Sequence, residues 1–249
     1  MKLQQNTFYQ QGSRGKPIVL LHYFGGAAKS WQWVISELSS NYQCFALNLP
    51  GFGNTEPLTK PSIENFTQWI LKAIESLGLS NCTLVGHSMS GKLALSVAAK
   101  NIGKVERVVL VAPSPPTREP MEESECERML KHPNLSEAEK TVEGSVKNVL
   151  TNERQSLAIE TQLIVDHNTW RWWLLDGMNH SIADRVAQVK IPVHLLASKD
   201  DPVIPFQPLC AELKNLLPNI QIDTVKGVGH LLPLEDPKWL ASQINTVVK

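Results

Sequence analysis

The chain has 249 residues, of which 42% are hydrophobic, and its 24 basic and 24 acidic side chains balance to a formal net charge of zero. This length suits one large α/β domain or two small ones. A neutral chain has no electrostatic footprint for nucleic acid or for an anionic membrane surface, so both are disfavoured as partners. We expect a small, uncharged molecule as the partner instead.

The termini, apolar runs and cysteines point to a soluble protein. The N-terminus lacks the apolar region of a signal peptide, and no apolar stretch reaches the length of a membrane span. The four cysteines are widely spaced and form no Cys-x-x-Cys pair, so they support neither a metal site nor a disulfide framework. We expect a reducing, cytoplasmic setting.

The first half of the chain alternates short apolar runs with longer amphipathic ones. We expect strands at 18–21, 44–47, 83–85 and 108–111, and helices at 31–39, 63–77 and 92–99. Strands that alternate with helices need crossover connections. The predicted fold class is therefore α/β, with a mostly parallel central sheet and helices on both of its faces.

The alternation stops at residues 112–120, a proline-rich linker that cannot form a helix or a central strand. The pattern is then helical to about residue 189, with candidate helices at 136–147, 154–168 and 182–189. Alternation resumes with a strand at 193–197, a helix at 206–216, a strand at 220–225 and a helix at 239–248. We therefore assign residues 1–113 and 190–249 to an α/β core, and residues 114–189 to an all-helical insertion.

The run from Gly86 to Gly91, Gly-His-Ser-Met-Ser-Gly, joins a predicted strand directly to a predicted helix. A nucleophilic serine at such a corner needs a sharp turn, with small residues on either side, and Gly86 and Ser90 meet that demand around Ser88. The backbone N–H of Met89, at the start of the helix, can help to stabilise an oxyanion. A loop merely punctuated by glycine and serine remains the alternative.

A serine nucleophile also needs a base and an acid that orients the base. His230 lies in a glycine-flanked loop after the strand at 220–225, and Asp200 and Asp201 follow the strand at 193–197. Loops beyond the carboxyl ends of strands are where α/β sheets gather their functional groups. The chain order serine, aspartate, histidine is the order that accompanies a nucleophile at a strand-to-helix turn.

These motifs make the chain similar to α/β-hydrolase fold proteins of the single-domain serine esterase type. The resemblance extends over essentially the whole chain, and its most specific segments are 20–22, 49–53, 86–91, 201–205 and 229–230. In that family the acid stands four residues before a proline that Pro205 matches, which selects Asp201 over Asp200. The resemblance implies that the insertion is a helical cap, or lid, over the active site. It also implies an oxyanion hole formed by the backbone N–H groups of Phe24 and Met89.

The chain departs from the family pattern at two positions. Tyr23 stands where the family usually has glycine, which implies altered geometry of the oxyanion loop or a phenol in the pocket. Ser90 replaces the second glycine of the serine motif, a small-for-small change. Relatives that open epoxides or displace halide use aspartate where this chain has Ser88, so those reactions are disfavoured.

The tryptophans at 170, 172 and 173 stand close together in the insertion. They favour packing between the insertion and the core, and Trp170 and Trp173 are also candidates for an aromatic wall of the substrate pocket, with Tyr23. The remaining histidines lack metal-ligand spacing, and the glycines lack a dinucleotide-binding fingerprint. We expect neither a metal nor an organic cofactor.

The predicted function is hydrolysis of a small, uncharged ester through an acyl-enzyme on Ser88. The same triad supports hydrolysis of thioesters or of carbon–carbon bonds, and perhydrolysis. A receptor-like ligand-binding protein, or an inactive member of the fold, stays an alternative because of Tyr23. Specificity lies in the cap and the pocket shape, which one sequence does not define.

Overall fold

The computed structural model describes residues 7–100 and 103–249. Within them a seven-stranded sheet has the order β1-β3-β2-β4-β5-β6-β7, in which β1 runs antiparallel to β3 and the other pairs are parallel. Its strands are β1 (Phe8–Gln11), β2 (Pro17–Leu21), β3 (Gln43–Leu47), β4 (Cys82–His87), β5 (Val105–Val111), β6 (Val193–Ser198) and β7 (Gln221–Val225). The predicted α/β class with a mostly parallel sheet is confirmed.

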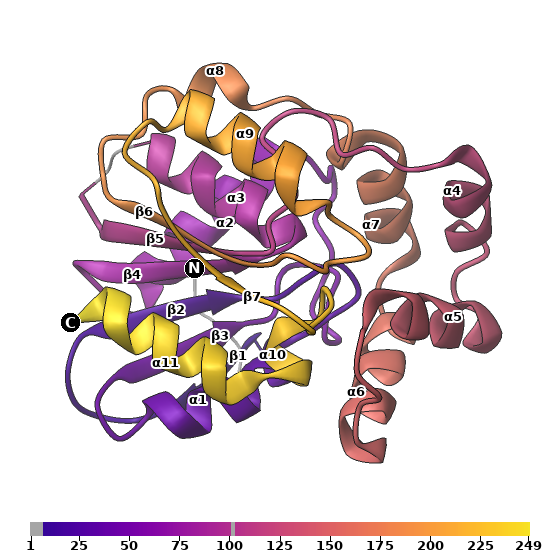
Figure 1. Cartoon of the computed structure of the whole chain (residues 1–249), viewed down its shortest axis with the longest axis horizontal. Helices are drawn as coiled ribbons and strands as arrows, with labels where there is room; N and C mark the ends of the chain where they lie inside the picture. Colours follow the sequence, from indigo (N-terminus) through magenta and orange to yellow (C-terminus); the bar gives the residue numbers. More distant parts are fainter. Residues whose placement is uncertain (1–6, 101–102) are drawn as a thin grey trace.

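The central strands are mostly apolar because both faces of the sheet are covered. In β2, Val19 and Leu21 belong to the buried cluster on one face, and Ile18 and Leu20 belong to the cluster on the other. The first face is covered by α2 (Ile63–Ser76), α3 (Met89–Ala99) and α9 (Phe206–Leu216). The opposite face is covered by η2 (Ala28–Trp31), α1 (Gln32–Leu38), α10 (Leu232–Glu235) and α11 (Pro237–Val248), and Figure 1 shows the three α-helices on that side.

Between β5 and β6, the described residues form helices and no strand. This segment contains α4 (Glu123–Met129), α5 (Leu135–Ser145), α6 (Asn152–Leu163), α7 (His167–Trp172), the π-helical turn η3 (Trp173–Gly177) and α8 (Ala183–Val186). Helices α4 to α7 lie together at one end of the sheet, whereas α8 packs on α3 (Figure 1). The division into a core and a cap at residues 114 and 189 remains our prediction. In the described part of the chain, no helix is long and apolar enough to span a membrane.

Two departures from the predicted elements have clear physical reasons. The predicted helix at 154–168 is two helices, because the Asp166 carboxylate accepts the Thr169 N–H at 2.8 Å and so begins α7 as a new helix. Strand β1 was not predicted. It is an edge strand with two exposed residues out of four, and it lacks the continuous apolar run that marks the central strands.

Candidate active site

Ser88 occupies a strained turn between β4 and α3. Its backbone angles, φ 53° and ψ −121°, lie in a region that residues with a side chain rarely adopt. The turn is held on both sides, because the Ser88 N–H donates to the Val111 carbonyl at 3.0 Å and the Ser88 carbonyl accepts the Ser114 N–H at 2.9 Å. The hydroxyl is thereby presented at the carboxyl edge of the sheet, although the residue is only 7% exposed.

Close packing around the turn explains its small residues. A Cβ atom on Gly86 would lie 2.3 Å from the Ser90 backbone oxygen, and one on Gly91 would lie 2.3 Å from the Cβ of Pro113. Ser90 adds a contact that glycine could not make, since its hydroxyl donates to the carbonyl of His22. The departure from the family motif at Ser90 therefore ties the serine turn to the loop that follows β2.

Three predicted residues from separate loops form one hydrogen-bonded chain. The Ser88 hydroxyl lies 2.8 Å from His230 Nε2, and His230 Nδ1 lies 2.8 Å from Asp201 Oδ2. Because a carboxylate only accepts, the His230 proton sits on Nδ1, which leaves Nε2 free to accept from the serine. The other Asp201 oxygen accepts the backbone N–H groups of Val203 and Ile204 at 2.8 and 2.9 Å.

Asp200 has a different partner. Its Oδ2 accepts the Gly227 N–H at 2.7 Å, so it holds together the loops that carry the aspartates and the histidine. The structure therefore brings Asp201, and not its neighbour, to the histidine.

Opposing effects act on the protonation of His230. Burial lowers its pKa, but the Asp201 carboxylate, by its charge and its hydrogen bond, raises it, as do the more distant Glu235 carboxylate and, only when it is ionised, Glu119. The net result is a pKa above the ordinary value of 6.5. An imidazolium that forms during a reaction is therefore stabilised in place.

The loop that carries His230 is anchored to the insertion, which the sequence did not indicate. The His230 N–H donates to the Ser145 carbonyl at the end of α5 at 2.8 Å. The Glu235 carboxylate accepts backbone N–H groups from Gly229 (2.9 Å), Lys147 (2.9 Å) and Asn148 (3.1 Å). From the core side, His87 Nε2–H donates to the His230 carbonyl at 2.9 Å and so holds the same loop.

The loop after β2, which the resemblance assigns to the oxyanion hole, is held by His22. Its Nδ1–H donates to the Tyr23 carbonyl at 2.8 Å, and its Nε2 accepts the Leu49 N–H at 3.2 Å. This pattern needs a neutral ring, and burial lowers the pKa of His22 to about 4. Phe24 lines the cavity next to Ser88. Met89 is the first residue of α3, where a backbone N–H has no acceptor within its own helix.

Tyr23 points its ring into a buried cluster that includes Val142 and Ala158 of the insertion and Leu231 of the core. Its hydroxyl has no hydrogen-bond partner among the described residues, and burial raises the pKa of the phenol to about 12. Tyr23 also belongs to the wall of the cavity. A neutral phenol therefore stands in the loop after β2.

A cavity of about 330 Å³ opens at Ser88 and His230, and both core and insertion contribute to its wall. Of the predicted pocket residues, Tyr23 and Trp173 line it and Trp170 does not. Trp170 is only 1% exposed and stacks on Phe24, with ring centroids 4.1 Å apart. It thus supports a wall residue from behind.

A family model described as "alpha/beta hydrolase fold" matches residues 16–164. The chain belongs to this family. Hydrolase YugF of Bacillus subtilis, itself uncharacterized, is 24% identical over 98% of this chain and 94% of its own length.

Solved structures agree with this assignment. An esterase from Exiguobacterium antarcticum has a TM-score of 0.89 at 16% identity, covering 97% of this chain and 94% of its own. A bromoperoxidase from Bacillus anthracis has a TM-score of 0.84 at 20% identity, covering 96% and 93%. At these identities the likeness shows the α/β-hydrolase fold and no particular substrate.

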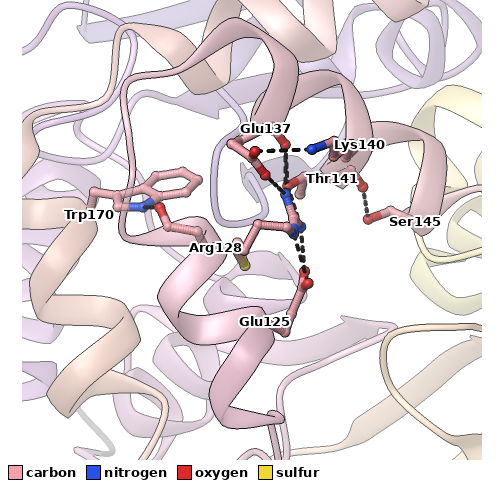
Figure 2. Close-up of polar contacts among 8 residues, drawn as sticks. Glu125, Arg128, Glu137, Lys140, Thr141, Ser145 and Trp170 are labelled. Atoms are coloured by element: carbon pink, nitrogen blue, oxygen red, sulfur yellow. Dashed lines mark hydrogen bonds and ion pairs between the residues drawn. The ribbon is translucent and has the colours of Figure 1, made fainter.

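Helices α4 and α5 carry a polar network of which Glu125, Arg128, Lys140 and Thr141 line the cavity. Figure 2 shows Arg128 of α4 between Glu125 and Glu137, with its guanidinium also donating to the Thr141 hydroxyl of α5 at 3.0 Å. The Arg128 Nε–H donates to Glu125 at 2.8 Å, and Nη1 donates to the Glu137 carboxylate at 3.1 Å. The network joins α4 to α5, and its guanidinium is occupied by protein partners. Across residues 7–100 and 103–249, no three potential ligands converge on a metal-sized site.

Proposed function

We propose that this α/β-hydrolase is a serine esterase that cleaves a small, uncharged ester through an acyl-enzyme on Ser88. The observation that carries the proposal is the chain of two 2.8 Å contacts from Ser88 through His230 to Asp201. In this mechanism His230 Nε2 takes the hydroxyl proton as Ser88 Oγ attacks the ester carbonyl. The tetrahedral intermediate then collapses, the ester C–O bond breaks, and His230 gives its proton to the departing alcohol.

Deacylation repeats these steps with water. His230 removes a proton from water, the hydroxide attacks the acyl carbonyl, and the proton returns to Ser88 as the carboxylic acid leaves. Asp201 keeps the proton on Nδ1 and stabilises the imidazolium in both halves of the reaction. We assign the oxyanion hole to the backbone N–H groups of Phe24 and Met89, each worth about 3–4 kcal/mol in comparable enzymes.

We further propose that residues 114–189 act as a cap that excludes water and selects the substrate. The cavity wall includes Met121, Val142 and Trp173 from this segment, which supports an apolar environment for the acyl or alcohol group. Tyr23 adds a neutral phenol to the same wall. The net charge of zero and the apolar residues of the wall favour an uncharged substrate. The wall also contains Glu122, Glu125, Arg128 and Lys140, and the Arg128 guanidinium is paired with protein carboxylates.

The assignment is tested with p-nitrophenyl acetate and a fluorophosphonate probe. We expect wild-type protein to release p-nitrophenol and to gain the mass of one phosphonyl group, and Ser88→Ala to do neither. Ser242→Ala, which alters an exposed serine of α11, serves as the matched control. Near-normal turnover by Ser88→Ala would refute the assignment of Ser88 as the nucleophile.

The same experiment separates the alternatives. An intact wild-type protein that the probe does not label would favour a ligand-binding role or an inactive site, because labelling requires an activated nucleophile. A protein that the probe labels, but that hydrolyses thioesters or carbon–carbon bonds or uses peroxide instead of hydrolysing oxygen esters, would support Ser88 as the nucleophile and assign it to another reaction class.

A further inference from the structure

Glu119 is an acidic side chain in the wall of the cavity that the proposed mechanism does not use. It lines the cavity together with Ser88 and His230, yet the residue is only 7% exposed. Its Oε2 atom is buried and makes no hydrogen bond of normal geometry among the described residues; the buried Ser114 hydroxyl, which acts on this carboxyl, makes none either. Buried polar atoms are normally paired, because lost hydration is otherwise uncompensated. A carboxyl left with an unused hydrogen-bonding position beside the nucleophile therefore indicates a ligand group.

The backbone that carries Glu119 is fixed on several sides. The Thr117 N–H and hydroxyl donate to the Glu212 carboxylate at 2.8 and 2.9 Å, and the ammonium of Lys92 donates to the Thr117 carbonyl at 2.9 Å. The Glu119 N–H donates to the Met178 carbonyl at 2.9 Å. The carboxyl thus stays at the cavity without any further ordering of the chain when a ligand binds.

The surroundings of Glu119 favour its neutral form. Burial raises the pKa of the carboxyl most strongly, and the negative charge of Asp201 adds to this, whereas the Ser114 hydroxyl, Lys92 and His230 act in the opposite direction. The net direction is upward. A neutral carboxyl carries an O–H donor that a carboxylate lacks.

We propose that Glu119 is a specificity residue that donates a hydrogen bond to an acceptor oxygen of the substrate, away from the reacting carbonyl. The proposal rests on the esterase function above and names the substrate class as uncharged esters with a second, ether-type or keto-type oxygen. A hydrocarbon at this position would leave the buried donor unpaired, so the site discriminates against it.

The test compares esters in which one methylene is replaced by an ether oxygen. On the acyl side the probes are p-nitrophenyl hexanoate, 4-methoxybutanoate and 3-ethoxypropanoate. On the alcohol side they are pentyl acetate and 2-ethoxyethyl acetate. After division by the rate of alkaline hydrolysis, the wild-type kcat/KM should favour an ether of at least one series by about three- to tenfold, the effect of one neutral hydrogen bond.

Variants at position 119 identify the donor. Glu119→Leu should lose the ether preference, and Glu119→Gln, whose amide is a neutral donor, should keep it. Glu122→Leu, at an exposed acidic residue of the same cavity wall, is the matched control and should also keep it. The proposal is overturned if no ether is preferred, if Glu119→Leu keeps the preference, or if Glu119→Gln loses it.

The pH dependence of the ether preference gives a second test, which can be made on the wild-type protein without a substitution. As the pH rises through the titration of Glu119, the wild-type ether preference should decline and that of Glu119→Gln should stay constant. Taking the ratio of two substrates at each pH cancels the titration of His230. A constant wild-type ratio would refute a neutral Glu119 donor. If Ser88-dependent hydrolysis of p-nitrophenyl hexanoate is itself absent, the esterase proposal fails instead.

Discussion

The strain at Ser88 leads to a prediction that does not depend on the substrate. With φ 53° and ψ −121°, a residue with a Cβ atom at this position is strained by about 1–3 kcal/mol, whereas glycine adopts such angles freely. Ser88→Ala and Ser88→Gly both remove the hydrogen bond to His230, so the difference between them isolates the backbone. Glycine loses about 0.5–1 kcal/mol through its greater freedom in the unfolded chain. It loses at most about 0.8 kcal/mol more through the missing buried methyl group.

The difference of these terms places Ser88→Gly between about 0.8 kcal/mol less stable and about 2.5 kcal/mol more stable than Ser88→Ala, and their middle values make it about 0.9 kcal/mol more stable. Urea unfolding followed by tryptophan fluorescence measures both free energies. Ala211→Gly, at an exposed position of α9, is the matched control, and should lose about 1 kcal/mol relative to wild type. If Ser88→Gly is less stable than Ser88→Ala by as much as this control loses, the turn is not strained and the reasoning is wrong.

Further predictions concern the groups around the site. Because burial lowers the pKa of His230 less than Asp201 and its neighbours raise it, wild-type kcat/KM should rise with pH through a midpoint above 6.5. Asp201→Asn should lower that midpoint and reduce the rate by about 10⁴-fold. Because the pKa of His230 is higher in the folded protein, its pairing with Asp201 contributes stability that is fully present below pH 6.5 and is lost as the pH rises through the folded pKa. Urea unfolding of wild type and Asp201→Asn at several pH values measures this contribution. Glu235→Ala leaves the buried Gly229 N–H unpaired and releases the loop that carries His230. It should therefore lower the free energy of unfolding by about 1–3 kcal/mol and lower kcat by a larger factor than it raises KM, and Glu235→Gln should have much smaller effects. Arg128→Leu should cost only about 1 kcal/mol, because its ion pairs are partly exposed, yet it should speed proteolysis between α4 and α5; unchanged cleavage would contradict the role of this network.

The core of the fold was predictable because its signals are local. A strand covered on both faces has an uninterrupted apolar run, and a helix on the sheet repeats its apolar residues every three or four positions. Each core strand and helix that we expected is present, with bounds that differ by a few residues at most. The helices of the insertion were harder to separate from one another. The start of α7 depends on the N-cap residue Asp166, whose N–H also donates to the distant Gly51 carbonyl at 2.8 Å.

For the site, the sequence by itself determined which residues stand after strand ends. Ser88, Asp201 and His230 were identifiable because parallel strands place their carboxyl ends at one edge, and the loops beyond them meet there. The structure places these side chains in contact, and their catalytic roles remain our proposal.

Only the tertiary structure decided which other side chains line the cavity or hold the histidine loop. Glu119 arrives from the linker and Glu235 from α10, and no local pattern singles them out, because a lone acidic residue has the same sequence signal on an exposed turn. The sequence predicts Trp170 and Trp173 equally as pocket residues, yet of these two only Trp173 lines the cavity. Periodicity shows that a helix has an apolar face, whereas the neighbour that covers that face is set by contacts between segments far apart in the chain.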